Sequence, residues 1–158
     1  MGAGADSEID SMPPSTYRFR VDGIPVAQPR HRASCRGGFA KMYLPKSHAV
    51  HSWKDRVGTA AMTAAKGVIE GAVKLDVAFV FKAPKKSQSG TFKISKPDID
   101  NLVKALMDAI TDAGVWMDDS QVVEIHAAKL FGSESAYAAV VIEPIDFRIL
   151  KPNALETT

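Results

Sequence analysis

The stretch that most constrains this chain is residues 95–121, SKPDIDNLVKALMDAITDAGVWMDDSQ, which predicts one amphipathic helix with acids at both ends. Pro97 suits the position just outside a helix or in its first turn, and Asp98 or Asp100 can cap the exposed amides. Gly114 stands where a left-handed C-terminal cap is needed, so the helix should end there. The expected core-facing residues recur at three- and four-residue steps: Ile99, Leu102, Val103, Leu106, Met107 and Ile110.

Four carboxylates flank this predicted helix. Asp98 and Asp100 open it, and Asp118 and Asp119 follow the turn after it. Each pair alone is typical of structure only, because an acid at a helix start is usually a cap and an Asp-Asp-Ser run is usually a turn. If the fold gathers both pairs, each like-charge contact near ~4 Å costs on the order of 4 kcal/mol at an effective dielectric of about 20. Lys104, one turn after Asp100, can cover one charge, which leaves a divalent metal ion as the natural partner for the rest.

Four short segments of this region carry a family resemblance: KPDIDNLVK at 96–104, DA at 108–109, AGVW at 113–116 and DDSQVV at 118–123. At this separation they resemble the signature of the RusA-type Holliday junction resolvases. The strong match covers about residues 96–129. The resemblance implies a small homodimeric, magnesium-dependent endonuclease of the bacterial cytoplasm, often encoded by a phage or prophage.

The resemblance also implies an activity and a set of site residues. The activity is structure-selective cleavage of DNA, in which paired symmetric nicks resolve Holliday junctions during recombination and repair and leave 5′-phosphate ends. The implied cofactor is Mg²⁺, with Mn²⁺ as a substitute, and the implied partners are four-way junction DNA and a second copy of the chain. Residue pattern alone does not choose between the two acids after the helix, because a one-residue shift exchanges the faces of a strand. The implied catalytic residues are Asp98, Asp100, Asp119 and Lys104, and the implied metal ligands are Asp98, Asp100 and Asp119, with Asp118 as an additional or water-mediated ligand.

The net charge of +2 conceals a strong asymmetry along the chain. Residues 13–97 contain sixteen Lys or Arg and four acids, whereas residues 98–158 contain four Lys or Arg and eleven acids. This division suits a phosphodiesterase, which needs a positive surface for a polyanion and carboxylates for a metal ion. The alternative is an ordinary solvated face, which is what most charge runs form.

Two basic segments are candidate DNA-binding surfaces. Residues 25–45 predict a hairpin that turns at Gly37-Gly38, with a charged edge ribbon or a loose loop as alternatives. Residues 82–96 contain five lysines and no acids. We expect this second segment to be mobile and to deliver a bound phosphate to the acids that follow it. The candidate DNA-binding residues are Arg30, Arg32, Arg36, Lys41, Lys85, Lys86, Lys93 and Lys96.

Periodicity elsewhere in the chain predicts the remaining elements. Residues 16–21 and 73–81 alternate as strands with one buried face, and residues 47–66 predict a helix capped by Ser47. Residues 121–131 and 136–142 predict two strands that pair antiparallel. This order indicates a single α+β domain in which two main helices pack on one side of a mixed sheet. The expected limits are a disordered leader at 1–15, an endonuclease domain at 16–146 and a tail at 147–158.

The amino-acid composition indicates the size of the core and the cellular compartment of the protein. A chain of 158 residues with 46% hydrophobic composition can bury one ordinary core. The single cysteine, Cys35, permits no internal disulfide and suits a reducing cytoplasm. No apolar run approaches the roughly 18 residues that a membrane span needs. We therefore expect a protein with no membrane contact and no organic cofactor.

Two other functions compete with a junction nuclease. In a phosphotransferase or phosphatase, Asp98 and Asp100 would be the nucleophile and the acid, but that chemistry expects a hydrophobic strand before the first aspartate, where this chain has KISKP. In a non-catalytic junction-binding protein, all four acids would serve only as caps. An EF-hand calcium loop is excluded, because Leu102 and Val103 stand where an oxygen ligand and a glycine are required.

Overall fold

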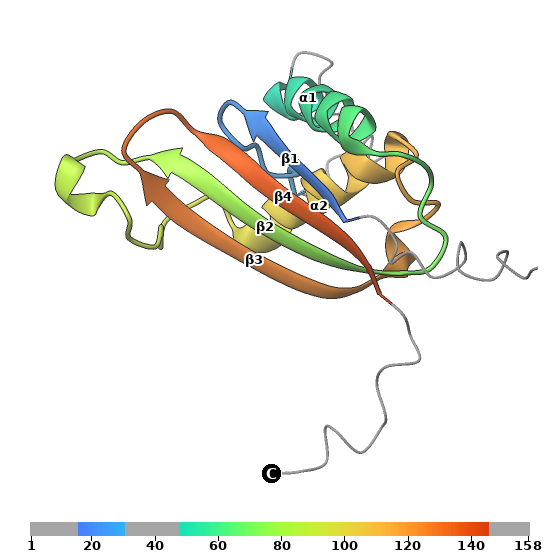
Figure 1. The fold of residues 1–158 in the computed structure, drawn as a ribbon. Helices are drawn as coiled ribbons and strands as arrows, with labels where there is room; N and C mark the ends of the chain where they lie inside the picture. Colours follow the sequence, from blue (N-terminus) through green and yellow to red (C-terminus); the bar gives the residue numbers. More distant parts are fainter. Residues whose placement is uncertain (1–15, 31–47, 146–158) are drawn as a thin grey trace, which may run out of the picture.

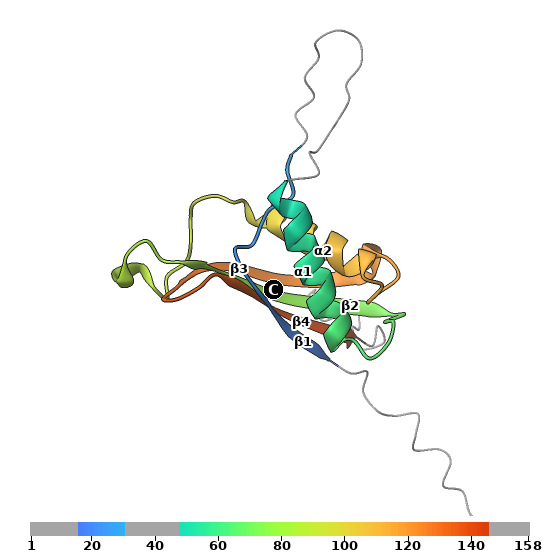
Figure 2. The ribbon, with the colours of Figure 1, turned by 90° about the horizontal axis from the view of Figure 1, so that it is seen from above.

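The computed structural model describes residues 16–30 and 48–145, in which two helices cover one face of a four-stranded mixed sheet (Figure 1, Figure 2). This arrangement confirms the predicted α+β class and the placement of both helices on one side. The strands are β1 (Tyr17–Asp22), β2 (Ala72–Lys82), β3 (Val122–Gly132) and β4 (Tyr137–Ile145), in the order β1-β4-β2-β3. The helices are α1 (Ala49–Ala64) and α2 (Ile99–Asp112), with 3-10 turns η2 (Lys86–Gln88) and η3 (Asp119–Gln121).

The strand β2 runs through the middle of the hydrophobic core. Leu75 and Phe79 on its helix-facing side are fully buried, whereas Lys74 and Asp76 on the opposite side remain partly exposed. Burying a large apolar side chain contributes roughly 1.5–3 kcal/mol. The alternation that predicted this strand thus also fixes which face of the sheet receives the helices.

The predicted antiparallel pairing of residues 121–131 with residues 136–142 is wrong. Strand β4 lies between β1 and β2 and is antiparallel to both, while β3 lies outside β2 and is parallel to it. The connection through α2 explains this difference, because strands joined through a crossover helix pair in parallel, whereas a short hairpin would make them antiparallel. As a consequence β3 is an edge strand of the sheet.

Helix α2 begins and ends where the sequence predicts. Asp98 is its N-cap residue, although the Asp98 side chain makes no capping hydrogen bond. Gly114 follows the helix with φ +74°, a conformation that glycine adopts without the steric cost of a side chain. The core-facing residues Leu102, Leu106 and Ile110 are fully buried. The helix is therefore fixed against the sheet while its first turn leaves both acids accessible.

Helix α1 is capped by a histidine. His48 is the N-cap residue, and its Nδ1 accepts a hydrogen bond from Val50 N at 3.1 Å. Ser47, the predicted cap, lies outside the described residues. Neither α1 nor α2, the two α-helices of the described ranges, is long and apolar enough to cross a membrane.

The lysine-rich connection from β2 to α2 runs back along the outer edge of β3. Gly90 N donates to Phe131 O at 2.8 Å, Phe131 N donates to Thr91 O at 2.9 Å, and Lys93 N donates to Lys129 O at 2.9 Å. We call residues 90–93 the strap. Within the connection that we expect to be mobile, the strap pairs with the last third of β3.

Candidate active site

The acids at the start of α2 converge on one cation. Arg30 Nη2 lies 3.4 Å from Asp98 Oδ2 and 3.2 Å from Asp100 Oδ2. A hydrogen bond of 2.9 Å from Gln28 N to Asn101 O holds the segment that carries Arg30 against the first turn of α2. The three charged side chains are 45–67% exposed, so a ligand from solvent can reach them.

The positive groups around this acid pair differ from those predicted. Arg30, a predicted DNA contact, serves here as the counter-ion of Asp98 and Asp100. Lys104, expected to cover Asp100, places its Nζ 3.9 Å from Asp108 Oδ1 instead. Arg30 pairs with Asp100 from a segment 70 residues away in sequence, whereas Asp108 lies one helical turn after Lys104. Lys104 still lies one turn from Asp100 on the same helix face, where it can turn toward a bound phosphate.

A lysine on β3 fixes the approach to the acid pair. Lys129 Nζ donates to Ser95 O and to Pro97 O, each at 2.8 Å. Lys129 was not among the residues predicted for the site. Its position on the helix-facing side of an edge strand is the signal that could have identified this anchor. The anchor joins the last third of β3 to the residue that precedes Asp98.

Lys93 in the strap also lies near this anchor. Its Nζ donates to Ser95 Oγ at 2.6 Å and stands 5.4 Å from the ring centroid of Phe81 and 5.3 Å from that of Phe131. Burial, and to a lesser extent the positive charge of Lys129, lowers the pKa of Lys93. The predicted DNA contact Lys93 is thus partly engaged within the domain.

Trp116 and Gln121 hold the turn after α2 in place, the first by burial and both by hydrogen bonds. The indole of Trp116 is buried, and its Nε1 donates to Thr111 Oγ1 at 2.7 Å. Sequence reasoning assigned no role to Gln121, although its place after two acids and a serine is that of the last residue of a capping box. Its side chain makes four hydrogen bonds: Nε2 donates to Ile69 O at 2.8 Å and Gly71 O at 2.9 Å, and Oε1 accepts from Met117 N at 2.7 Å and Asp118 N at 3.0 Å.

The two acids of this turn are not equivalent. Asp118 is the N-cap of η3, and its Oδ1 accepts a hydrogen bond from Ser120 N at 2.8 Å. Hydrogen bonding by Ser120 lowers the pKa of Asp118. The Asp119 side chain takes no part in this cap. A hydrogen bond with the Asp119 side chain is a further, smaller cause of the lowered pKa of Asp118.

Within one chain, the acid pairs at the two ends of α2 do not meet. Helix α2 has 14 residues, which corresponds to about 21 Å at 1.5 Å per residue. Asp98 and Asp100 lie at its start, and Asp119 lies beyond its end, at the beginning of β3 (Figure 1). Residues 16–30 and 48–145 contain no group of three or more His, Cys, Asp or Glu placed to hold a metal ion. Within the described residues of one chain the two acid pairs therefore do not form one cluster, because the helix separates them.

The other predicted DNA-binding residues occupy two different parts of the chain. Lys85, Lys86 and Lys96 are exposed in the connection between β2 and α2. Of the three, only Lys96 is placed beside the acid pair by the chain path, because it stands two residues before Asp98, whereas Lys85 and Lys86 lie at η2. The predictions for Arg32, Arg36 and Lys41 fall outside the described residues.

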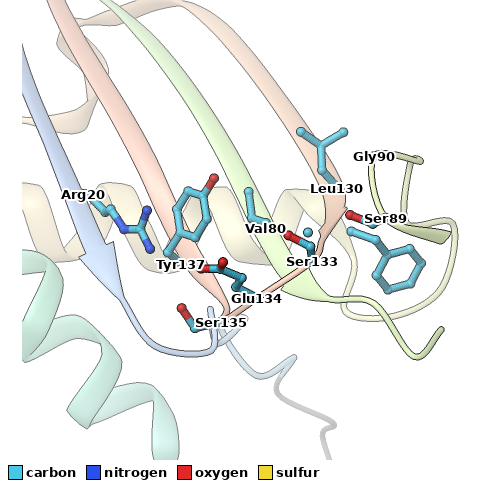
Figure 3. Close-up of a pocket in the computed structure, with 11 residues that line it drawn as sticks. Arg20, Val80, Ser89, Gly90, Leu130, Ser133, Glu134, Ser135 and Tyr137 are labelled. Carbon is cyan, nitrogen blue, oxygen red and sulfur yellow. The ribbon is translucent and has the colours of Figure 1, made fainter. Parts of the chain in front are cut away.

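A surface pocket lies away from all of these acids. It has a volume of about 410 Å³ and is lined by the ends of β2 and β3, the start of β4 and the loop between β3 and β4 (Figure 3). In this pocket the Arg20 guanidinium stacks 3.7 Å from the ring centroid of Tyr137. Glu134 is the single carboxylate of the lining, so the pocket does not offer the paired acids of a metal site.

Comparison with known proteins gives consistent matches. The family model described as Endodeoxyribonuclease RusA matches residues 22–143. The chain is 40% identical over 116 residues to the crossover junction endodeoxyribonuclease rusA of Lactococcus phage r1t, covering 72% of this chain and 86% of that protein. It is 33% identical over 138 residues to the uncharacterized protein YqaN of Bacillus subtilis (strain 168), covering 80% and 95%. It is also 54% identical over 33 residues to the crossover junction endodeoxyribonuclease RusA of Escherichia coli (strain K12), covering 21% and 28%.

Proposed function

The chain belongs to the RusA endodeoxyribonuclease family, and on this premise we propose that it resolves four-way DNA junctions by paired, Mg²⁺-dependent nicks during recombination and repair. Membership of a nuclease family argues against the phosphotransferase and the non-catalytic hypotheses. The observation that carries the proposal is the convergence of Asp98 and Asp100 on one guanidinium nitrogen. We place this activity in the bacterial cytoplasm, with a phage or prophage gene as a source in keeping with the phage relative.

The acid pair at the start of α2 fits a magnesium ion. Mg²⁺ prefers carboxylate oxygens and is usually held by one or two carboxylates together with phosphate oxygens of the substrate. Asp98 and Asp100 supply two such groups at one solvent-accessible place. When bound, the ion lowers the pKa of a coordinated water and stabilises charge on the scissile phosphate. Mn²⁺ has the same ligand preference and can substitute for it.

The residues around the acid pair have separate tasks in this proposal. Arg30 neutralises Asp98 and Asp100 in the protein without metal, and its guanidinium can turn to a phosphate oxygen when metal replaces it. Lys104 neutralises charge that develops on the phosphate or on the leaving oxygen. Asp119 is the third metal ligand, chosen over Asp118 because the carboxylate of Asp118 caps η3.

The test of this function uses a labelled four-way junction and a matched linear duplex. We expect nicks in the junction with Mg²⁺, none in EDTA, and 5′-phosphate ends that a DNA ligase can reseal. The Asp100→Asn variant should bind the junction in Ca²⁺ as the wild type does. Its nicking rate should fall at least ~100-fold, because losing a metal ligand removes about 2.7 kcal/mol or more of transition-state stabilisation. Unchanged nicking by Asp100→Asn would remove this residue from the mechanism.

The exposed lysines before α2 are the proposed DNA contacts within the described part of the chain. Replacing both Lys85 and Lys86 with alanine should weaken junction binding and reduce the slope of log affinity against log salt by about 2, because each lysine neutralises one phosphate. A titration by fluorescence anisotropy at several salt concentrations measures this slope. Lys66→Ala, which changes an exposed lysine after α1, is the matched control and should leave the slope unchanged.

A further inference from the structure

Two large apolar side chains are exposed on the segment that leads into α2. Phe92 lies in the strap and is 71% exposed, and Ile94 directly follows the strap and is 97% exposed. We call these two residues the apolar pair. Residues 82–97 around them contain five lysines and no acid. A single exposed apolar side chain is common, but two of them close together on a basic segment form a surface that a partner can contact.

Phe92 is held in place by its main chain and not by burial of its ring. Hydrogen bonds on either side of it join the strap to β3, which makes Phe92 and Leu130 directly opposite residues. The side chains of such a pair lie on the same face of a sheet. Successive side chains of a strand alternate between faces, and Lys129 reaches the start of α2 on the face that carries the helices. Leu130 and Phe92 therefore point to the face without helices.

The residue between the two members of the apolar pair anchors the segment from the helix side. Lys93 Nζ donates to Ser95 Oγ at 2.6 Å. Lys129 Nζ donates to the main-chain oxygens of Ser95 and Pro97, each at 2.8 Å. These bonds tie the segment to β3 up to the residue before Asp98. The apolar pair and the acids at the start of α2 are thus parts of one fixed unit.

The apolar pair lies within reach of DNA bound at the acids. Ile94 precedes Asp98 by four residues and Phe92 precedes it by six. Their Cα atoms are therefore at most about 14 Å and about 22 Å from that of Asp98, at about 3.6 Å per residue. Successive phosphates of one DNA strand advance about 3.4 Å along the axis, so the apolar pair is within about six nucleotides of a phosphate at the acids.

We infer that Phe92 and Ile94 cover the face of a base pair at the branch point of a four-way junction, and that this contact selects branched DNA over linear duplex. This inference rests on the proposed function. In a linear duplex each base pair is stacked on its neighbours, so an inserted side chain must first separate two of them. Where the arms of a junction diverge, that stacking is already interrupted, and an apolar side chain can replace the lost neighbour.

The position of the apolar pair also suits a branched substrate. The Phe92 ring points to the face of the sheet without helices, whereas Asp98 and Asp100 lie at the start of α2, on the other side of the same edge. A junction, whose arms diverge from the branch point, can contact both sides of this edge at once. The fixed path between Phe92 and Asp98 would then set the distance from the branch point to the cut phosphate.

The charge around the apolar pair favours DNA over a second copy of the chain as the partner. A two-fold contact uses the same surface on both copies, so it would place the lysines of one copy against those of the other. Phosphates instead neutralise Lys85, Lys86 and Lys96, which are exposed. In this arrangement the lysines bind the DNA backbone, and the uncharged apolar pair responds to base stacking.

Equilibrium binding to a labelled four-way junction and a matched linear duplex, in Ca²⁺, tests the inference without cleavage. The double variant Phe92→Ser with Ile94→Ser should bind the junction about 10-fold more weakly, because it loses the contact with a base face. Its affinity for the duplex and its salt dependence should stay within about twofold of the wild type, because no phosphate contact is changed. Met62→Ser, at a position of α1 that is 62% exposed, is the matched control and should bind both DNAs as the wild type does.

Two further variants separate a lost contact from a damaged fold. Phe92→Leu keeps an apolar side chain that can still cover a base pair, so it should lose less than about threefold in junction affinity. Ile94→Ser alone removes a side chain that is 97% exposed, so its urea midpoint should equal that of the wild type. Its junction affinity should nevertheless fall while its duplex affinity does not.

A crosslink locates the contact on the DNA. In a Cys35→Ser background, Ile94→Cys should form a disulfide with a thiol tethered to a base at the branch point, and not with the same group in the middle of an arm. Met62→Cys is the control and should react with neither. Crosslinking only within the arm, or at no position, would overturn the inference.

The remaining outcomes distinguish this inference from the proposed function. Equal losses for junction and duplex, or no loss for either, would overturn the inference. So would a change in the sedimentation of the free double variant, because the apolar pair would then contact protein. If the wild type nicks junctions while the double variant keeps its preference for them, the inference fails and the nuclease assignment stands. If the wild type binds junctions through the apolar pair but does not nick them in Mg²⁺, the nuclease assignment fails and the contact stands.

Discussion

The two ends of α2 carry similar acids in opposite states. At its start, Asp98 occupies the N-cap position but makes no side-chain cap, and it shares one arginine with Asp100. After its end, Asp118 caps η3 and is held together with Gln121 in a network of hydrogen bonds. The second region uses Asp118 and Gln121 for structure. The first holds Asp98 and Asp100 only in an exposed ion pair with Arg30, from which a ligand can displace them.

The largest expected effect is on the nicking rate, when one acid at each end of α2 is replaced in turn. Asp98→Asn should lower the Mg²⁺-dependent nicking rate by roughly 100-fold or more, since the proposed metal site loses a ligand. Asp118→Asn should change the rate by less than about fivefold, because the amide oxygen still accepts the hydrogen bond from Ser120. Single-turnover assays on a four-way junction measure both. Equal reductions in rate for the two variants would contradict the different roles proposed for Asp98 and Asp118.

A second comparison concerns stability at the end of the helix. Gln121→Ala should lower the free energy of unfolding by about 1–3 kcal/mol, because it removes four hydrogen bonds to the backbone. Gln88→Ala, at an exposed position of η2, is the control and should change it by less than about 0.5 kcal/mol. Urea denaturation followed by tryptophan fluorescence provides both values. Equal midpoints for the two variants would show that the network around Gln121 adds no stability.

A smaller effect is expected from the cation at the start of the helix. Arg30→Ala should strengthen Mn²⁺ binding to the free protein by about two- to fivefold, because the guanidinium competes with metal for Asp98 and Asp100 and an exposed ion pair is worth up to about 1 kcal/mol. Calorimetry without DNA measures this affinity. Arg20→Ala, which removes the partner of Asp22, is the control and should have no effect. Weaker Mn²⁺ binding in Arg30→Ala would mean that Arg30 positions the ligands.

The smallest expected effect is a pH dependence at Asp118. Hydrogen bonding by Ser120 lowers the pKa of Asp118 from its ordinary value of 3.8. A carboxyl group whose pKa is lower in the folded protein stabilises the fold above its unfolded pKa, and this contribution disappears as the pH falls through the folded value. Asp118→Asn should therefore be slightly less stable than the wild type near pH 6 and equal to it at the lowest pH where the protein stays folded. A difference that is the same at every pH would contradict this assignment.

Local features of the sequence predicted local structure well. The limits of α2, the cap at Gly114 and the alternation of β2 follow from residues within a few positions of one another, and the structure confirms all three. The sequence also placed Asp98 and Asp100 on the surface, and their side chains are exposed in the structure. Short-range steric and hydrophobic preferences decide these features, so a single sequence contains the required information.

Long-range features were predicted poorly. Arg30 reaches Asp100 across 70 residues, and Gln121 reaches Ile69 across 52. The insertion of β4 between β1 and β2, and the separation of Asp98 from Asp119, depend likewise on which segments meet in space. No local pattern encodes these contacts, because the chain brings the segments together only when the whole sheet forms. The proposed metal site is the feature most affected, because Asp98 and Asp119 lie at opposite ends of α2.

The strap has a consequence for how relatives of this chain can diverge. Its three hydrogen bonds to β3, together with those from Lys129 to Ser95 O and Pro97 O, fix the path by which the chain enters α2. A strap paired with other residues of β3 would change that path and shift the first turn of the helix. Changes in one surface loop would thus move Asp98 and Asp100 with no substitution among the acids themselves.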